Sequence, residues 1–569
     1  MAPSDASSGA SASLSPMRAC WQAARERATA LEDVTAAVNA GSAAVAGTPH
    51  PLEIAAAAVL AWLAQPQTEQ ARQEARVAAA QAAAAAKAKG NQAYQRGRFD
   101  EAAALYGQAA RLAARAGAHA HAEATVAVCL ANRSAALAEL HAWPRVLADV
   151  AAAFEAGYPV AGSTRLHRRR FAALLALGQR DNAAAALAEA QRVAEADAAL
   201  TDAQRRGLAD DAQRLASAPP PPQTGAPGEA PAAPAAAVAD VASQPQSDAA
   251  SPFGRYLVAA RRAPAGTLVL AEAPVAVVTT APTACAACGR TAVHLVPCLR
   301  CGALQYCDAA CAARDRAASH GDAECAAAAE VLADAPWGPS VLLAARVARA
   351  ARQPDAARVA VPGHYDAAAT AVPVTEPTPL TAFVDGLESH WHRLAPSVLL
   401  DGPLWLAARA LAGLPVEATA RAVAHLAVHA CAMRCNAFAL HAAEDDAVVG
   451  LALYPLASRL NHACTPNAIV SYACRTRKQG TRLCTSLLTT SRVAGAVRGG
   501  VGASFADRTL QLRTTADVEA VAQLFVSYGP MANRMPTAAR RAQLREDYHF
   551  ECSCTACSRC VPLPGRLSG

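Results

Sequence analysis

Apolar residues recur at helical spacing through the first third of the chain. From residue 87 to about residue 193 most of them are alanines, and the pattern breaks at Gly97, Gly117, Gly178 and two aromatic-proline pairs. The spacing predicts a run of amphipathic helices over residues 85–200. A helical lead-in is expected over residues 51–84, and residues 1–50 are expected to form a disordered tail.

The pattern changes after residue 216. Residues 216–252 are rich in Pro, Ala, Ser and Gln and show no periodicity. Such a segment cannot bury enough apolar area to offset its ordering entropy, so we expect a semi-extended linker. Short strand-like runs then appear at residues 255–259 and 267–270. The fold class predicted for the whole chain is therefore multidomain α+β.

Composition narrows the function classes. A chain of 569 residues has room for several domains, and its net charge of +6 is mild for that length. We do not expect direct nucleic-acid binding on this charge. The hydrophobic fraction of 53% is largely alanine, and no uncharged apolar run of about 18 residues occurs. A membrane span is therefore not expected.

Cysteines carry the first candidate chemistry. The chain has 18, grouped as C-x-x-C and C-x-C pairs with a histidine in one group. This grouping favours zinc thiolates in a reducing compartment over disulfides, so we expect a cytoplasmic or nuclear protein. The alternative, unrelated buried cysteines, fits the spacing poorly. The candidate ligands are Cys285, Cys288, Cys298, Cys301, Cys307, Cys311, His320 and Cys325 upstream, and Cys552, Cys554 and Cys557 downstream.

Three further segments lie near the end of the chain in a fixed order. Residues 461–467 read Asn-His-Ala-Cys-Thr-Pro-Asn, residues 525–530 read Phe-Val-Ser-Tyr-Gly-Pro, and residues 552–557 hold the downstream cysteines. Together they resemble the catalytic core and post-SET zinc site of SET-domain methyltransferases. The upstream cysteine row resembles a MYND zinc finger. The chain is thus similar, over roughly residues 250–560, to the SET and MYND domain-containing protein-lysine methyltransferases.

This resemblance implies a domain layout and three structural zinc ions. The layout has a first SET part at 253–284, a MYND finger at 285–325, a helical insert at 326–430, a SET core at 431–530, and a post-SET segment and tail at 531–569. In the family the finger ligands interleave, and Cys464 completes the downstream trio; Cys560 is a competing ligand. MYND fingers usually bind peptide partners. The implied ligand sets are Cys285, Cys288, Cys307 and Cys311; Cys298, Cys301, His320 and Cys325; and Cys464, Cys552, Cys554 and Cys557.

The resemblance also implies S-adenosylmethionine as cofactor and a lysine of a histone or non-histone protein as substrate. Methyl transfer needs a neutral amine in line with the sulfonium and a site that excludes water. Tyr528 and Tyr548 match the catalytic tyrosines of the family. Asn436 is expected on a strand. The residues expected to bind the cofactor are Gly254, Arg255, Asn436, Asn461, His462, Tyr528 and Phe550.

Three departures from the family pattern keep a second function open. Tyr256 stands where the first SET strand usually has a second glycine, and residues 521–523 (Val-Ala-Gln) replace a Gly-Glu-Glu-like turn. A low-complexity basic insert spans residues 475–508. The alternative to an enzyme is a catalytically weak or inactive zinc-binding adaptor or co-chaperone scaffold.

The helical part carries a separate resemblance. Residues 87–94 with 99–102, residues 129–136 and residues 166–171 resemble the openings of three tetratricopeptide (TPR) repeats, the number that stacks into a stable solenoid. Five side chains match those with which co-chaperones of this type bind the C-terminal carboxylates of heat-shock chaperones. An ordinary solvated face is the alternative. These side chains are Lys87, Asn91, Asn132, Arg165 and Arg169.

Overall fold

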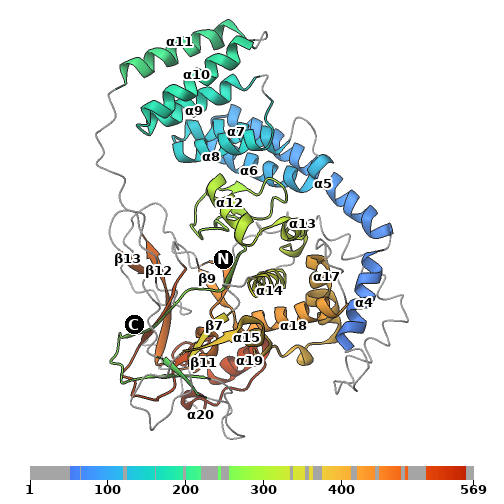
Figure 1. Ribbon diagram of the computed structural model, residues 1–569, viewed down its shortest axis with the longest axis vertical. Helices are drawn as coiled ribbons and strands as arrows, with labels where there is room; N and C mark the ends of the chain where they lie inside the picture. Colours follow the sequence, from blue (N-terminus) through green and yellow to red (C-terminus); the bar gives the residue numbers. More distant parts are fainter. Residues whose placement is uncertain are drawn as a thin grey trace, which may run out of the picture.

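The protein has a helical array at one end, a zinc-finger region in the middle and a sheet-containing part at the other end (Figure 1). Among the described residues no helix has the length and apolar character needed to cross a membrane. The computed structural model describes residues 51–64, 66–119, 125–159, 162–196, 200–218, 241–244, 256–333, 337–352, 358–362, 375–411, 420–441, 447–475, 481–484 and 508–558.

The array consists of three helix pairs followed by one more helix. Its interior is mostly alanine with a few larger residues such as Leu130 and Leu137, so the helices pack closely. Glycines in the left-handed region, such as Gly97 (φ +72°), end helices without steric cost. The helices are α5 (Pro66–Gln95), α6 (Phe99–Ala116), α7 (Val126–Glu139), α8 (Trp143–Glu155), α9 (Thr164–Ala176), α10 (Arg180–Ala196) and α11 (Asp202–Ser217), with a 3₁₀ turn η1 (Gly117–His119) after α6.

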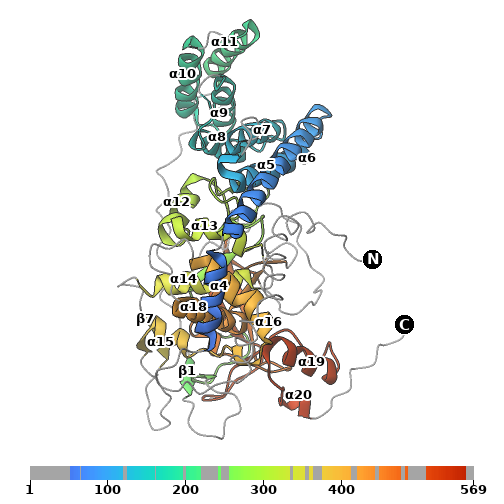
Figure 2. The same cartoon turned by 90° about the vertical axis from the view of Figure 1, so that its right-hand side faces the viewer.

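Helix α4 (Pro51–Leu63) belongs with the sheet-containing part although α5 follows it at once (Figure 2). Its apolar face, which includes Leu52 and Trp62, lies in the same buried cluster as Leu453. The Trp62 ring is 5.2 Å from the Trp405 ring, centroid to centroid. The predicted lead-in over residues 51–84 is therefore not one unit. It contains α4 and the first part of α5, and α5 continues without a break past the predicted boundary at residue 84.

The finger region (residues 285–325) has little regular structure. It contains the short strands β5 (Val296–Pro297) and β6 (Gln305–Tyr306), helix α12 (Ala309–Ala318) and the start of helix α13 (Asp322–Val331). The side chain of Asp308 caps α12 by accepting a hydrogen bond from the backbone N–H of Cys311 at 2.8 Å.

The array lies directly against the finger, and a buried ion pair marks the contact. Arg133 of α7 is 1% exposed and donates to both carboxylate oxygens of Asp149 at 2.8 and 2.5 Å. Its remaining nitrogen donates to the backbone oxygen of Leu295 at 3.0 Å, and Arg145 donates to that of Cys307 at 3.2 Å. At Gly302 an added Cβ would lie 2.2 Å from a backbone oxygen of α6. The finger and the array are therefore packed as one unit.

The sheet-containing part is built from small sheets. One has the order β13-β12-β14-β3, a second β4-β10-β9, and two-stranded sheets pair β1 with β2, β11 with β15 and β7 with β8. The strands are β1 (Val241–Gln244), β2 (Tyr256–Ala259), β3 (Leu268–Glu272), β4 (Ala276–Thr279), β7 (Arg358–Pro362), β8 (Thr375–Pro379), β9 (Phe438–His441), β10 (Val448–Leu453), β11 (Asn461–His462), β12 (Ala468–Arg475), β13 (Thr481–Cys484), β14 (Leu510–Thr514) and β15 (Phe525–Val526).

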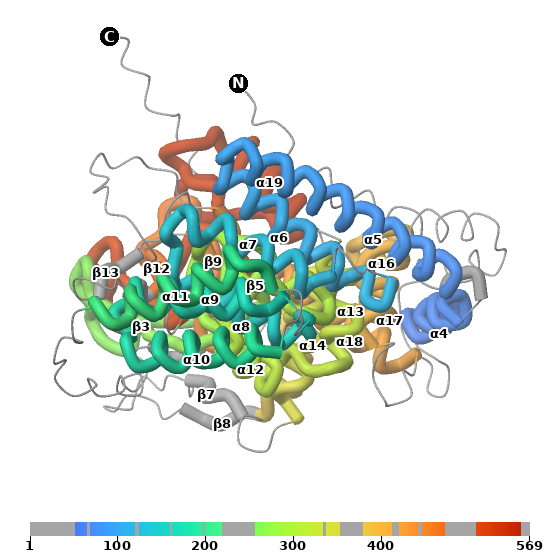
Figure 3. The backbone as a smooth tube through the Cα atoms, turned by 90° about the horizontal axis from the view of Figure 1, so that it is seen from above, coloured from blue at the N-terminus to red at the C-terminus, as the bar shows by residue number. Residues whose placement is uncertain are grey.

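Helix α14 packs against strands β4 and β10 of the second sheet, and it lies close to α18 (Figure 3). Helices α14, α17 and α18 share an apolar cluster with α4, and α19 and α20 follow the last strand. The helices are α14 (Gly338–Ala350), α15 (Leu380–Asp385), α16 (Pro396–Leu399), α17 (Trp405–Leu411), α18 (Ala420–Asn436), α19 (Thr537–Tyr548) and α20 (Thr555–Ser558), with short turns η3 (Trp391–Arg393), η4 (Leu400–Leu404) and η5 (Ala457–Arg459).

Further predicted boundaries differ from the structure. The predicted linker over 216–252 is wrong in two respects, because α11 extends to Ser217 and strand β1 lies within it and pairs antiparallel with β2. The predicted boundary at 430/431 falls inside α18, which is one continuous helix. Part of the predicted insert forms strand β13, which pairs with β12. Residues 1–50, 219–240, 245–255, 476–480 and 485–507 lie outside the described residues.

Candidate active site and zinc clusters

Two groups of finger residues are placed to hold metal ions, in the interleaved sets that were predicted. In each group the ligand atoms lie within 4.8 Å of one another. Tetrahedral zinc–sulfur bonds of about 2.3 Å put neighbouring sulfurs about 3.8 Å apart. The Sγ atoms of Cys288 and Cys307 are 3.6 Å apart, and those of Cys298 and Cys325 are 3.7 Å apart. The groups therefore fit zinc without rearrangement.

A third group lies at the other end of the molecule. It unites Cys464, which follows the Asn-His pair, with the cysteines at 552, 554 and 557. The sulfur of Cys464 is 3.9 Å from that of Cys552 and 3.5 Å from that of Cys557. The predicted fourth ligand is thus in place, and Cys560 lies outside the described residues. Arg540, which is 1% exposed, donates towards the sulfur of Cys557 at 3.6 Å.

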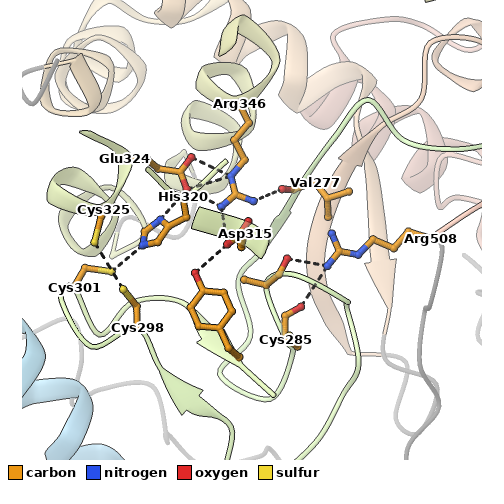
Figure 4. A network of polar contacts seen from close by, with 12 residues as sticks. Val277, Cys285, Cys298, Cys301, Asp315, His320, Glu324, Cys325, Arg346 and Arg508 are labelled. Atoms are coloured by element: carbon orange, nitrogen blue, oxygen red, sulfur yellow. Dashed lines mark hydrogen bonds and ion pairs between the residues drawn. The ribbon is translucent and has the colours of Figure 1, made fainter. Parts of the chain in front are cut away.

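The second finger group is held to the sheet-containing part by buried charges (Figure 4). Nε2 of His320 faces the sulfur of Cys301 at 3.5 Å, and its Nδ1 lies 3.0 Å from a carboxylate oxygen of Glu324. A carboxylate on the second nitrogen fixes the tautomer that presents Nε2 to a metal. Arg346 of α14 donates to Glu324 at 2.6 Å and to the backbone oxygen of Val277 in β4 at 2.6 Å.

The first finger group is also connected to the sheet-containing part by an arginine. Arg508, just before β14, donates to the backbone oxygens of Cys285 at 3.3 Å and Ala286 at 2.9 Å (Figure 4). Its own carbonyl accepts a hydrogen bond from the hydroxyl of Tyr454 at 2.7 Å. Each zinc group of the finger is therefore connected to the sheet-containing part through an arginine of its own, Arg508 for the first and Arg346 for the second.

A cleft of about 490 Å³ opens between the segment after α15, the end of α18, η5 and the segment after α19. This volume is in the range of small-molecule sites. Its lining residues come from regions more than 150 positions apart in the sequence. They include Asn436, Asn461, His462, Tyr528, Tyr548 and Phe550, together with Cys552 of the third metal group.

A short parallel strand pair borders the cleft through the residues of β11. Asn461 and His462 of β11 lie opposite Phe525 and Val526 of β15. Asn467 joins the two segments beyond the pair: its amide nitrogen donates to the backbone oxygen of Gln523 at 2.8 Å, and its Oδ1 accepts the backbone N–H of Phe525 at 2.8 Å. The pairing of these two segments thus depends on one amide side chain as well as on backbone hydrogen bonds.

His462 connects the cleft to the third metal group. Its Nδ1 accepts the backbone N–H of Tyr528 at 3.0 Å, so the ring proton of the neutral form is on Nε2. Nε2 lies 3.3 Å from the sulfur of Cys464 and can donate to it. The same imidazole therefore contacts the Cys464 sulfur of the third metal group and the backbone of Tyr528.

Aromatic rings line the cleft next to this imidazole. The ring centroid of Tyr528 is 4.8 Å from that of Tyr548 and 6.3 Å from that of Phe550. The Tyr528 hydroxyl donates to the backbone oxygen of Leu460 at 2.6 Å. Burial raises the pKa of Tyr528, and burial, with the nearby Asp547 carboxylate, raises the pKa of Tyr548 to about 12. Both phenols are protonated at neutral pH.

Asn436 reaches the cleft from a helix, so the prediction of a strand at this position is wrong. It is the last residue of α18, and β9 begins at Phe438. Its amide nitrogen donates to the backbone oxygens of Glu388 and Ala432, each at 2.8 Å. Because both amide hydrogens are engaged, a ligand would meet Asn436 through the Oδ1 acceptor.

The segment before β2 holds two of the predicted cofactor-binding residues, and the turn at residues 521–523 departs from the family pattern. Gly254 and Arg255 lie outside the described residues, immediately before β2. In the turn before β15, Val521 has a φ of +66°, a region that costs a β-branched residue free energy. Its backbone N–H nevertheless donates to the backbone oxygen of Ala259 at 2.8 Å.

The five residues predicted to bind a chaperone terminus lie on the first helix of each pair. Lys87 and Asn91 are on α5, Asn132 on α7, and Arg165 and Arg169 on α9. Tyr106 donates to Oδ1 of Asn91 at 2.9 Å, which leaves the amide hydrogens of Asn91 for an acceptor. Arg169 already donates to the backbone oxygen of Ala131 at 3.0 Å.

Sequence reasoning missed three residues around the site: Glu272, Asn467 and Arg540. Asn467 belongs to the motif at 461–467, so its place there was a usable signal. Glu272 and Arg540 are single charged residues in ordinary strand and helix patterns, and nothing in those patterns marks them as buried.

The first similarity to known proteins lies in the finger. A family model described as the MYND finger matches residues 285–325. Protein-lysine N-methyltransferase SMYD4 of Danio rerio is 31% identical over 112 residues, 20% of this chain and 14% of the relative. SMYD4 of Homo sapiens is 29% identical over 105 residues, 18% of this chain and 9% of the relative. N-lysine methyltransferase SMYD2-B of Danio rerio is 27% identical over 115 residues, 20% of this chain and 18% of the relative.

These matches confirm the predicted finger with its predicted bounds. The matched segments span less than a fifth of the length of each of these three relatives. Together the finger and the three relatives support the SET and MYND domain protein-lysine methyltransferase family for this chain.

Proposed function

We propose that this chain, as a member of the SET and MYND domain family, transfers a methyl group from S-adenosylmethionine to a lysine of a histone or non-histone protein. The observation that carries the proposal is the meeting of Asn461, His462, Tyr528 and the aromatic pair Tyr548 and Phe550 around one cleft. The third metal group borders the same cleft through Cys552.

S-adenosylmethionine would supply the methyl group on a positively charged sulfur. The acceptor Oδ1 of Asn436 and the residues of β11 would hold the cofactor's polar ends. Aromatic faces attract cations and exclude water, so Tyr528, Tyr548 and Phe550 suit the sulfonium side of the cleft. The residues present therefore fit the cofactor.

The tyrosines in this proposal position reactants and do not remove protons. A phenol with a pKa raised by burial stays protonated at neutral pH, so it cannot act as a general base there. The Tyr528 hydroxyl, which donates to the Leu460 carbonyl, would orient the incoming amine towards the methyl group that the cofactor supplies. The substrate lysine must therefore either arrive as the neutral amine or lose its proton to a group other than these tyrosines.

Zinc has a structural part in the proposal. Each group already contains four Cys or His ligands, so no position is left for a reactive water. The third ion would fix Cys464 and, through His462, the backbone of Tyr528. Since thiolate ligands require a reducing compartment, the proposed location is the cytoplasm or the nucleus.

The array and the finger are proposed to recruit protein partners. The array would form a TPR solenoid with Lys87, Asn91, Asn132, Arg165 and Arg169 as a binding surface for chaperone C-termini. Two amides and three cations suit a terminal carboxylate beside an acidic side chain. Any peptide bound by the finger must use a face that the array does not cover.

The experiment is a transfer assay with labelled S-adenosylmethionine and a panel of purified histones and other recombinant proteins. Zinc-loaded chain should label at least one protein on lysine, and a Tyr528→Phe variant of equal zinc content should label it at least tenfold more slowly. If the chain binds the cofactor but neither it nor the variant labels a substrate, the adaptor alternative is favoured.

A further inference from the structure

Glu272 is a buried carboxylate that the proposed chemistry does not use. It ends β3 and is 8% exposed. Its Oε1 accepts the backbone N–H of Leu456 at 2.7 Å, and its Oε2 accepts that of Ala457 at 2.9 Å. These two residues begin the single turn η5, which leads into Asn461. A side chain from a distant strand therefore anchors the start of this turn.

The other end of the same turn shapes the cleft. Ser458 and Arg459 line it, and the carbonyl of Leu460 accepts the Tyr528 hydroxyl at 2.6 Å. Asn461 follows and pairs with β15. Residues 456–461 thus run as one short segment from the Glu272 carboxylate to the proposed cofactor site.

The protonation state of Glu272 decides what it can hold. An ionised carboxylate accepts hydrogen bonds on both oxygens, whereas a protonated one carries an O–H that cannot accept as well and must itself find an acceptor. Burial raises the pKa of Glu272 to about 7, against the opposing effects of the two backbone N–H groups and the positive charge of Arg459. Its cross-strand neighbour, Leu510, is apolar.

We propose that Glu272 is a positioning residue whose ionised carboxylate holds residues 456–460 in the arrangement that presents Leu460 and Asn461 to the cleft. Protonation then releases one of the two backbone N–H groups and loosens the turn. The proposal deepens the proposed function, on which its consequence for cofactor binding rests; the contact itself does not depend on that function.

The pH dependence has two opposite signs, and this distinguishes positioning from simple stabilisation. Folding raises the pKa of Glu272 above its ordinary value of 4.5. Its contribution to stability is therefore complete below about pH 4.5 and is lost as the pH rises through about 7. The order of residues 456–460 has the opposite pH dependence, because the turn is held by the ionised carboxylate of Glu272. This order therefore increases with pH over the upper part of the same pH range.

The first test reads the turn without the cofactor. Hydrogen exchange would be measured by mass spectrometry on peptides covering residues 454–462 in the full zinc-loaded chain. In Glu272→Gln the exchange should be about tenfold faster or more, because one buried N–H loses its acceptor. The matched control is Glu519→Gln, since the Glu519 side chain is 73% exposed and makes an ion pair only with Arg262 on the surface. Wild-type exchange in Glu272→Gln would overturn the proposal.

The second test reads the cleft. Wild-type affinity for S-adenosylmethionine should fall about tenfold between pH 8 and pH 6, Glu519→Gln should follow it, and Glu272→Gln should bind weakly with no such slope. A parallel slope in Glu272→Gln would overturn the proposal. If no protein binds the cofactor but the exchange difference is present, the proposed function fails and the anchoring of the turn stands.

Glu272→Asp decides the matter if the glutamine variant does not fold. It keeps the charge on a shorter side chain, so exchange in residues 454–462 should lie between wild type and a released turn. Exchange in Glu272→Asp equal to that of Glu519→Gln would contradict the proposal.

Discussion

The finger and the third metal group use the same ligand chemistry in different surroundings. The two finger groups lie between the array and the sheet-containing part, and arginines on both sides, such as Arg133 and Arg346, bind them to their neighbours. The third group lies against the cleft and contacts Tyr528 through His462. Zinc in the finger therefore holds domains together, whereas zinc in the third group holds the proposed active site together.

The largest expected effect separates the two regions directly. Cys552→Ser should remove one zinc of three and reduce affinity for S-adenosylmethionine at least a hundredfold, because Cys464 and His462 lose their anchor. Zinc stoichiometry by elemental analysis and calorimetric titration would measure this. Cys129→Ser, at a buried cysteine outside the groups, is the control and should keep three zinc ions. Unchanged affinity in Cys552→Ser would contradict the comparison.

A finger variant should behave differently. Cys298→Ser should also lose one zinc and should unfold the finger, since metal binding supplies about 10 kcal/mol or more of folding free energy in small zinc domains. Proteolysis should then cut between the array and the sheet-containing part, while cofactor affinity falls less than in Cys552→Ser. Equal loss of affinity in both variants would mean that the two regions are not separable.

The candidate ligands of the finger could be predicted because ligand type and spacing are local properties of the sequence, whereas their division into two interleaved sets was implied by the family resemblance. The position of α4 could not, since an amphipathic pattern shows which face is buried but not what covers it: Trp62 packs on Trp405, far along the chain. The family resemblance implied a strand at Asn436, but α18 extends to this residue and β9 begins only at Phe438. In the sequence Glu272 has the pattern of a surface residue, and only the contact between β3 and the start of η5 shows that it is buried.

The next effect tests the buried ion pair between α7 and α8, which lies where the array meets the finger. Arg133→Met should lower the free energy of unfolding by about 3–5 kcal/mol, because it leaves the Asp149 carboxylate buried without its partner. Denaturant unfolding of the full chain measures it. The double variant Arg133→Met/Asp149→Leu should recover much of the loss; a double variant as unstable as the single one would show that the ion pair is not the cause.

The smallest expected effect concerns the turn at residues 521–523. Val521→Gly should raise stability by up to about 1 kcal/mol, because glycine adopts a φ of +66° without strain although it loses more entropy on folding. A thermal shift of the full chain measures it, with Val293→Gly as the control at an exposed valine outside this turn. Equal shifts for both variants would show that Val521 is not strained.

The most direct test of the central claim is calorimetric titration of the zinc-loaded chain with S-adenosylmethionine, beside Asn461→Ala and Tyr528→Phe. We predict binding by the wild type, loss of binding in Asn461→Ala and nearly unchanged binding in Tyr528→Phe, since Tyr528 acts mainly on the reacting groups. A folded chain carrying three zinc ions that shows no binding would contradict the claim and leave a zinc-binding adaptor.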